Sequence, residues 1–459
     1  MTWTDDTICL NALCRLIEHI IHGDLHPDSV DLINAAVSIS LDKGDDRIRP
    51  IAVPEALYKI AGRYLLSHIP VASCFPSIQL GCGISGGSEK AVHSIQAALE
   101  KRGPGTIVLN LDSSNAFNTR PLHLIAKAVY ACKEASVAWR FFHTMYMKGS
   151  KMGVFSKGSL IHAFEFLEGV KQGCPLAAFF YCLSVQAIYE ECVKDLDIDA
   201  FAISDDFILV GSPSVCFEAF RRFKAHPHAP QLNIPKCRAL WPVTKTTHPF
   251  YAEFIAGAAR LGLTAVHGCM KVLGAPVGLV NTSRTDFCTK VEVSHTRFFD
   301  ALCHPHMPAQ TAMLLLRLSG LPRLSYLSRV VPPSLLLSAA RDFDSLVINA
   351  AIIISSLPDT NKTRKTLTQP MRFGGLGLRS HVFCSSFAFW SAFALASARI
   401  PCFHKDLCKY IATSFNTIKA YGIDPSHKSL SKFFPLELED LWEIYKKYEP
   451  TLSQPAHFH

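Results

Sequence analysis

The stretch "FAISDDFILVG", residues 201–211, sets two adjacent aspartates, Asp205 and Asp206, inside an otherwise apolar run. Apolar β-formers on each side of an aspartate pair predict a β-hairpin with both carboxylates at its tip. No lysine or arginine occurs in the stretch. Two interpretations are open here: an ordinary turn, where aspartate is common, or a site that holds a divalent cation.

A third carboxylate stands at the end of another predicted strand. The segment "GTIVLNLD", residues 105–112, is mainly apolar and ends at Asp112, so it predicts a buried strand. Taken alone, Asp112 also suits a turn or a helix cap. A two-metal site needs carboxylates from separate strands that converge around ions about 3.5–4 Å apart. A strand end beside a hairpin tip can supply that geometry.

Helical patterns surround these strands. A helix is predicted from about Ser88, with Ala91, Ile95 and Leu99 on one face, and others begin near Pro121, Pro175 and Pro213. The middle of the chain therefore alternates strands with helices, which predicts an α+β layer with helices over a sheet. The first hundred residues are predicted to be mostly helical, interrupted by "DKGDDRIRPIAVP", residues 42–54, and the chain is predicted to be helical again from about residue 280.

Composition narrows the class of protein. The chain has 459 residues, a net charge of +8 and only 18% charged residues, where soluble domains have about 25%. This balance predicts a core-rich globular protein of several lobes and is compatible with a polyanionic partner. The longest apolar runs are too short to span a bilayer, so no membrane association is expected. The sixteen cysteines form no C-x-x-C pair, and the Cys402, His404 and Cys408 spacing fits no common zinc pattern.

Six short motifs occur in a fixed order: "DKGDDRIRPIAV", "LDSSNAFN", "EGVKQGCPLAAFF", "ISDDFILVG", "LNIPKC" and "KVLGAPVG". This series resembles the motif order of reverse transcriptases, most closely those of non-LTR retrotransposons, over roughly residues 3–380. The resemblance implies a right-hand polymerase of the α+β class, with an antiparallel-sheet palm covered by helices, helical fingers and thumb, and a helical C-terminal tail. The implied boundaries are 1–104 for the fingers, 105–280 for the palm with part of the fingers inserted, 281–345 for the thumb and 346–459 for a C-terminal region of unknown role.

The resemblance also implies a reaction: RNA-directed DNA synthesis, with an RNA template, a DNA primer and dNTP substrates. Asp112 and Asp205 would ligate two Mg²⁺ ions, with Mn²⁺ as an alternative, and Asp206 would assist. One ion would lower the pKa of the primer 3′-hydroxyl, and the other would hold the triphosphate. The chain would act inside the cell, in the nucleus, and its oligomeric state is open.

Other residues receive roles through the same resemblance. Arg49 and Lys43 would contact the triphosphate, and Gln172 and Gly173 would line the nucleotide pocket. Lys236 would donate a proton to pyrophosphate. Each of these residues also has an ordinary explanation, as a solvated cation or a loop residue. The template–primer backbone would be held by Lys290, Arg297, Arg317, Arg323 and Arg329.

Phe117 stands five residues after Asp112, where the family places a bulky aromatic under the sugar of the incoming nucleotide. A ring there would exclude a 2′-hydroxyl, which favours DNA over RNA synthesis, although simple core packing also explains it. Ile203 occupies a position where the family usually has an aromatic residue. Two alternatives therefore stand beside the leading interpretation: an RNA-dependent RNA polymerase, and an inactive retroelement relic that binds nucleic acid.

Overall fold

The computed structural model describes residues 7–42, 48–396 and 416, so Lys43 and the Cys402, His404 and Cys408 group lie outside the described residues. The chain divides into two compact units. The first is formed by Met1–Gly87, Asn110–Leu209 and Phe217–Cys237, and the second by Ser88–Leu109, Val210–Cys216 and Arg238–His459. Strands β3 and β7 each contribute residues to both units.

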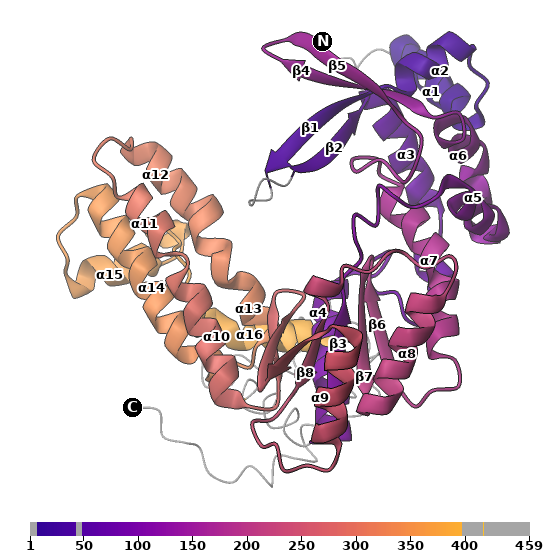
Figure 1. The fold of residues 1–459 in the computed structure, drawn as a ribbon. Helices are drawn as coiled ribbons and strands as arrows, with labels where there is room; N and C mark the ends of the chain where they lie inside the picture. The colour runs from indigo at the N-terminus through magenta and orange to yellow at the C-terminus, as the bar shows by residue number, and fades with distance from the viewer. Residues whose placement is uncertain (1–6, 43–47, 397–415, 417–459) are drawn as a thin grey trace. The chain divides into compact units, whose positions relative to one another are not determined.

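Helices lie at one end of a four-stranded sheet in the first unit, and its two hairpins project away from them (Figure 1). The sheet order is β2-β1-β4-β5, and β1 pairs antiparallel with β2 but parallel with β4. Ala36, Ala52 and Met152 form a buried cluster on this sheet, with Phe166 packed against it. The elements are α1 (Thr7–His22), α2 (Pro27–Asn34), β1 (Ala36–Asp42), β2 (Ile48–Pro54), α3 (Ala56–His68), α5 (Leu122–Ala131), α6 (Trp139–Tyr146), β4 (Ser150–Ser156), β5 (Ser159–Phe166) and α7 (Ala177–Val193).

The sequence analysis did not predict the two hairpins of this sheet, β1–β2 and β4–β5. Residues 36–42 form β1 and residues 48–54 form β2, where helices interrupted by a non-helical segment at residues 42–54 were expected, and β4 and β5 lie where only connecting chain was expected. The β4–β5 turn has positive φ at both central residues, Lys157 (+49°) and Gly158 (+82°), which is the backbone of a two-residue type I′ hairpin turn. Most side chains of β5 are exposed, so it lacks the clean apolar alternation that a sequence pattern would reveal.

The predicted central strands lie in a five-stranded sheet of order β6-β7-β3-β8-β9. Ile107, Val108, Leu109 and Leu111 of β3 are fully buried, as are the apolar residues of β7. β8 and β9 pair parallel, joined by a helix, so this sheet is not purely antiparallel. The elements are β3 (Ile107–Leu111), β6 (Asp199–Ile203), β7 (Asp206–Gly211), α8 (Pro213–Ala225), β8 (Arg238–Trp241), α9 (Phe250–Leu261) and β9 (Thr264–His267).

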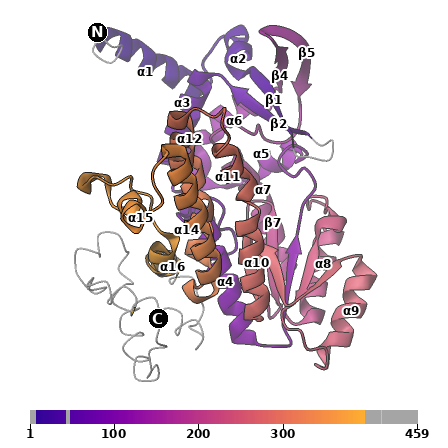
Figure 2. The same ribbon diagram turned by 90° about the vertical axis from the view of Figure 1, so that its left-hand side faces the viewer.

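The rest of the second unit is mainly helical. Helix α4 is buried along most of its length, and the predicted face of Ala91, Ile95 and Leu99 is fully buried. Helix α10 runs beside the long helix α14 (Figure 2). The elements are α4 (Gly87–Arg102), β10 (Cys269–Val272), β11 (Ala275–Gly278), α10 (Asn281–Val293), α11 (Thr296–Leu302), α12 (Ala309–Leu315), α13 (Ser325–Val330), α14 (Pro333–Ser355), α15 (Asn361–Thr368) and α16 (His381–Ala396).

The α+β fold class is therefore confirmed, and the expected strands and helices between residues 87 and 241 are present. In the described part of the chain, no helix has both the length and the apolar character needed to cross a membrane.

Candidate active site

The aspartate pair lies at the tip of the β6–β7 hairpin, as the sequence predicts. Ser204 begins the turn with a φ of +55°, a left-handed conformation that residues other than glycine seldom adopt. Three hydrogen bonds hold it there. The Ser204 N–H donates to Gln79 Oε1 (2.8 Å), while its carbonyl accepts from Gln79 Nε2 (3.3 Å) and from the Tyr189 hydroxyl (3.2 Å). The carboxylates thus project from a turn of fixed geometry.

Sequence reasoning missed the residues that fix this turn. Gln79 is fully buried in a segment that runs beside β6, where the Leu80 N–H donates to the Ala202 carbonyl (2.8 Å). The Gly81 N–H donates to Gln79 Oε1 (2.9 Å), and a Cβ at Gly81 would lie 2.5 Å from the Ser204 nitrogen. Glycine is therefore required at this close approach. The glycine-rich loop that contains Gly81 gave a sequence signal, but its partner is about 120 residues away along the chain.

Asp112 directly follows β3, the neighbour of β7 in the five-stranded sheet. Its backbone is anchored on both sides, because its carbonyl accepts from the Asn233 N–H (2.8 Å) and its N–H donates to Cys237 Sγ (3.4 Å). The Lys236 ammonium lies 3.9 Å from Asp112 Oδ2, with side chains 50% and 32% exposed. An ion pair this long and this exposed is weak, so it leaves the carboxylate accessible to another cation.

The negative charges of Asp205 and Asp112 act on the carboxyl group of Asp206. Burial, followed by the negative charges of Asp205 and Asp112, raises the pKa of Asp206 to about 6. Nearby like charges disfavour the ionised form, which fits the placement of Asp112 directly after β3 and of Asp206 at the start of the neighbouring strand β7. A half-buried set of carboxylate oxygens suits Mg²⁺ by donor type, and a divalent cation would neutralise their repulsion.

The three aspartates do not form a closed cage. Within the described residues, one trio of His, Cys, Asp or Glu side chains has all its ligand atoms within 4.8 Å of one another, and it lies elsewhere in the chain. Magnesium sites of this kind take a few carboxylates and complete their coordination with water and substrate phosphates. An open set of carboxylates is compatible with such a site.

Phe117 is linked to the aspartates through Tyr181. The two rings are stacked, with centroids 4.4 Å apart and planes inclined by 16°. Burial and then the negative charge of Asp205 raise the pKa of Tyr181, which places Tyr181 near that carboxylate. Phe117 is half-buried, so part of the residue is exposed to solvent.

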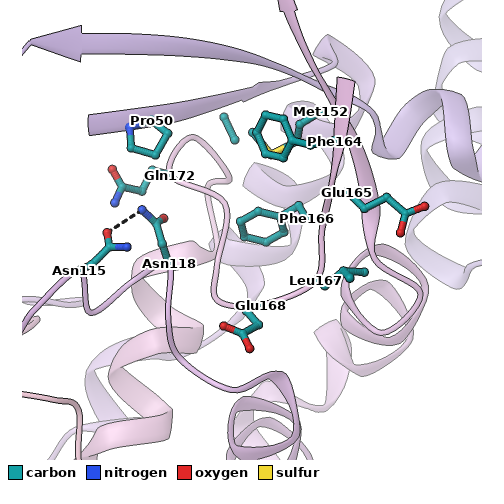
Figure 3. Close-up of a pocket in the computed structure, with 11 residues that line it drawn as sticks. Pro50, Asn115, Asn118, Met152, Phe164, Glu165, Phe166, Leu167, Glu168 and Gln172 are labelled. Atoms are coloured by element: carbon teal, nitrogen blue, oxygen red, sulfur yellow. Dashed lines mark hydrogen bonds between the residues drawn. The ribbon is translucent and has the colours of Figure 1, made fainter. Parts of the chain in front are cut away.

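Gln172 lines a pocket of about 360 Å³ in the first unit (Figure 3). Asn115 and Asn118 join it on the same wall, with the Asn118 amide donating to Asn115 Oδ1 (2.9 Å). Aromatic side chains of β5 line the pocket as well. The remaining lining residues are Pro50, Ala52, Met152, Phe164, Glu165, Phe166, Leu167 and Glu168. A cavity with amide groups and aromatic rings suits a polar ligand with a flat ring.

The turn that carries Gln172 is packed tightly against β2. Gly173 has a φ of +150°, and a Cβ there would lie 1.9 Å from the Ala52 carbonyl oxygen. Before it, the buried Lys171 donates from Nζ to the Asn34 carbonyl (3.0 Å) and also to the Asn34 side chain. Burial lowers the pKa of Lys171 to about 8. These contacts fix the position of Gln172, and sequence reasoning did not single out Lys171.

The remaining predicted residues lie in varied settings. Arg49 belongs to β2, but only its backbone is described. Four of the five predicted nucleic-acid-binding residues are exposed on helices of the second unit: Lys290, Arg297, Arg317 and Arg323. Arg329 is ion-paired with Glu89 (3.1 Å), so part of its charge is already compensated. Arg323 lies 3.8 Å from the centre of the Phe298 ring.

Part of the sequence matches one protein family, and the fold is distantly similar to solved structures. Residues 41–228 match the family model described as reverse transcriptase (RNA-dependent DNA polymerase). No curated protein matches the chain. Among solved structures, telomerase from Candida albicans with a fragment of telomeric RNA is similar at 12% identity and a TM-score of 0.42, over 91% of this chain and 65% of that one.

Two structures of Candida tropicalis telomerase are also similar at 12% identity. The apo enzyme has a TM-score of 0.43 over 92% of this chain and 70% of that chain, and the C-terminally truncated form 0.36 over 45% and 50%. These likenesses are distant. The family match includes Asp112, Phe117, Gln172, Asp205 and Asp206. Residues 41–228 therefore carry the sequence pattern of a reverse transcriptase domain, and the carboxylate site lies within it.

Proposed function

We propose that this chain is an RNA-directed DNA polymerase that extends a primer by nucleotidyl transfer at Asp112, Asp205 and Asp206. The observation that carries the proposal is that Asp112 directly follows β3 while Asp205 and Asp206 stand where the neighbouring strand β7 begins, inside the region that matches the reverse transcriptase model. The retroelement origin proposed with it rests on the order of the six sequence motifs.

The chain's own residues have distinct tasks in this reaction. Asp112 and Asp205 would hold Mg²⁺, whose charge activates the primer 3′-hydroxyl and stabilises the leaving pyrophosphate. Gln79, Gly81 and Tyr189 fix the turn that carries Asp205, so the carboxylate needs little rearrangement during the reaction. Gln172 and the amides of Asn115 and Asn118 would contact the incoming nucleotide from the pocket wall.

Lys236 has a position that fits its predicted role. Its ammonium lies 3.9 Å from Asp112 Oδ2 and is half-exposed, so it can reach a phosphate bound at that carboxylate. A lysine there can compensate charge that develops on pyrophosphate and can deliver a proton to it. Phe117 would lie under the sugar and disfavour ribonucleotides, a role supported by its stacking on Tyr181 beside Asp205.

We further propose that residues 1–104 act as fingers, 105–280 as palm and 281–345 as thumb. The helical character of residues 281–345 supports the last assignment. The exposed cations Lys290, Arg297, Arg317 and Arg323 would contact the template–primer backbone, so affinity for it should fall steeply with salt. The proposed retroelement origin would place the chain in the nucleus.

Primer extension on an RNA template tests the proposal. Purified chain with Mg²⁺ and dNTPs should lengthen a labelled DNA primer, and Asp205→Asn should abolish the product. Asp24→Asn, which changes an exposed aspartate of the same unit, is the matched control and should extend normally. Ribonucleotides in place of dNTPs should give little product.

Each alternative predicts a different outcome. Preferential extension with ribonucleotides would contradict the DNA polymerase and support an RNA-dependent RNA polymerase. Binding of the template–primer with no extension under either nucleotide set would contradict enzymatic activity and support a relic that binds nucleic acid.

A further inference from the structure

A second group of potential metal ligands lies away from the carboxylate site. Two sulfur atoms and one carboxylate oxygen lie within 4.8 Å of one another in this group, which consists of Cys74, Cys132 and Glu134. Cys132 Sγ lies 3.7 Å from Cys74 Sγ and 3.6 Å from Glu134 Oε2. All three residues belong to the first unit, and both cysteines are half-buried.

These separations match the edges of a tetrahedral zinc site. With Zn–S bonds of about 2.3 Å and Zn–O bonds of about 2.0–2.2 Å, two sulfurs would lie about 3.8 Å apart and a sulfur and an oxygen about 3.5–3.7 Å apart. The observed 3.7 Å and 3.6 Å agree with both values. Two of the three ligand–ligand separations therefore already fit a tetrahedral ion, and the third is within 4.8 Å.

Local structure fixes the three ligands. Cys132 is the C-cap residue directly after α5, where its N–H donates to the Ala128 carbonyl (3.1 Å), and its own carbonyl accepts from the Ala135 N–H (3.1 Å). Glu134 follows in the short 3-10 helix Lys133–Ala138, so two ligands share one tight turn. Cys74 ends the 3-10 helix Val71–Cys74. The cluster thus joins two segments 58 residues apart in sequence.

We propose that Cys74, Cys132 and Glu134 bind a borderline or soft divalent cation of the Zn²⁺ type, with water as the fourth ligand. Thiolate ligands select such ions over Mg²⁺, so this site would be chemically distinct from the all-oxygen carboxylate site. Two thiol protons leave when the ion binds. The site clips the segment after α3 to the segment after α5, which stabilises the first unit, because the unfolded chain has no such preformed site.

Cobalt binding to the full chain, kept in a phosphine reductant, tests the site. Co²⁺ should bind one per chain with a thiolate charge-transfer band and the visible bands of tetrahedral cobalt, and Zn²⁺ should displace it. Cys74→Ser and Cys132→Ser should each lose the charge-transfer intensity of one thiolate and bind at least about tenfold more weakly. Glu134→Gln, at an exposed position, should weaken binding with little risk to folding.

The double variant Cys9→Ser/Cys14→Ser is the matched control, because it removes the same number of thiols as the site contains, from exposed positions. It should bind Co²⁺ like the wild type. Zn²⁺ should also raise the Tm of the wild type and of this control, but not that of Cys132→Ser.

Three results would overturn the proposal. These are a wild-type chain without a thiolate–cobalt spectrum, a spectrum unchanged in both Cys74→Ser and Cys132→Ser, and a Cys74–Cys132 disulfide that persists under reductant.

Discussion

Gly81→Ala tests whether the rigid hairpin tip matters for the proposed reaction. The added Cβ would lie 2.5 Å from the Ser204 nitrogen and 3.0 Å from the Ile203 carbonyl carbon. Ordinary contact begins at 3.4 Å, so the tip must retreat by about 0.9 Å. Both close atoms are backbone atoms, so a side-chain rotation cannot relieve the contact.

A displacement of about 1 Å at a reacting group can cost about 100-fold in rate, which is about 2.7 kcal/mol in the activation barrier. We therefore expect Gly81→Ala to lower kcat for primer extension by about 100-fold. The variant should remain folded, because overpacking one methyl typically costs about 1–3 kcal/mol. Single-turnover extension measures the rate, and hydrogen exchange at the 203–207 amides reports the displaced tip.

Gly103→Ala is the matched control for this experiment. Gly103 has a φ of +79° with nothing within 4 Å of an added Cβ, so alanine there introduces backbone strain without touching the tip. Its kcat should equal that of the wild type. A Gly81→Ala enzyme with wild-type kcat and unchanged exchange at the tip would refute the argument that this glycine positions Asp205.

Three further predictions concern Phe117, Gly173 and Lys171. Phe117→Val should raise incorporation of ribonucleotides relative to dNTPs in competition assays, and an unchanged ratio would contradict its contact with the sugar. Gly173→Ala should lower the free energy of unfolding by about 2–3 kcal/mol in urea, because its Cβ would lie 1.9 Å from the Ala52 oxygen; wild-type stability would contradict that contact. Burial lowers the pKa of Lys171 from 10.5 to about 8, so the unfolded chain binds more protons between these values. Unfolding free energy should therefore rise from pH 8 to 10.5 by at most about 3 kcal/mol, and Lys171→Met should lose that part of the slope.

Much of the carboxylate site was predictable from local pattern. Strand β3 is apolar except for Asn110, and the β6–β7 hairpin has mainly apolar strands on both sides of its aspartate pair. The helix that begins near residue 87 has regular spacing of Ala91, Ile95 and Leu99. These signals depend on short stretches of chain, where periodicity is a direct consequence of burial.

The supports of the site were not predictable in the same way. Gln79 reaches Ser204 across 125 residues, and neither residue has a local pattern that indicates the contact. The pairing of β1 with β4 is also non-local, and β5 is exposed on nearly every residue. Lys171 is a buried cation, a placement that charge statistics alone oppose, and its contacts with Asn34 and with two aromatic rings compensate for its burial.

The proposed two-metal site of Asp112 and Asp205 is tested most directly by a crystal structure of the chain with an RNA–DNA template–primer, a dNTP and Mn²⁺, with data recorded at the manganese absorption edge. We expect two anomalous peaks about 3.5–4 Å apart, which mark two ions bound to carboxylate oxygens of Asp112 and Asp205. Peaks bound elsewhere, or an Asp112 carboxylate directed away from the Asp205 carboxylate in the presence of substrate, would contradict it.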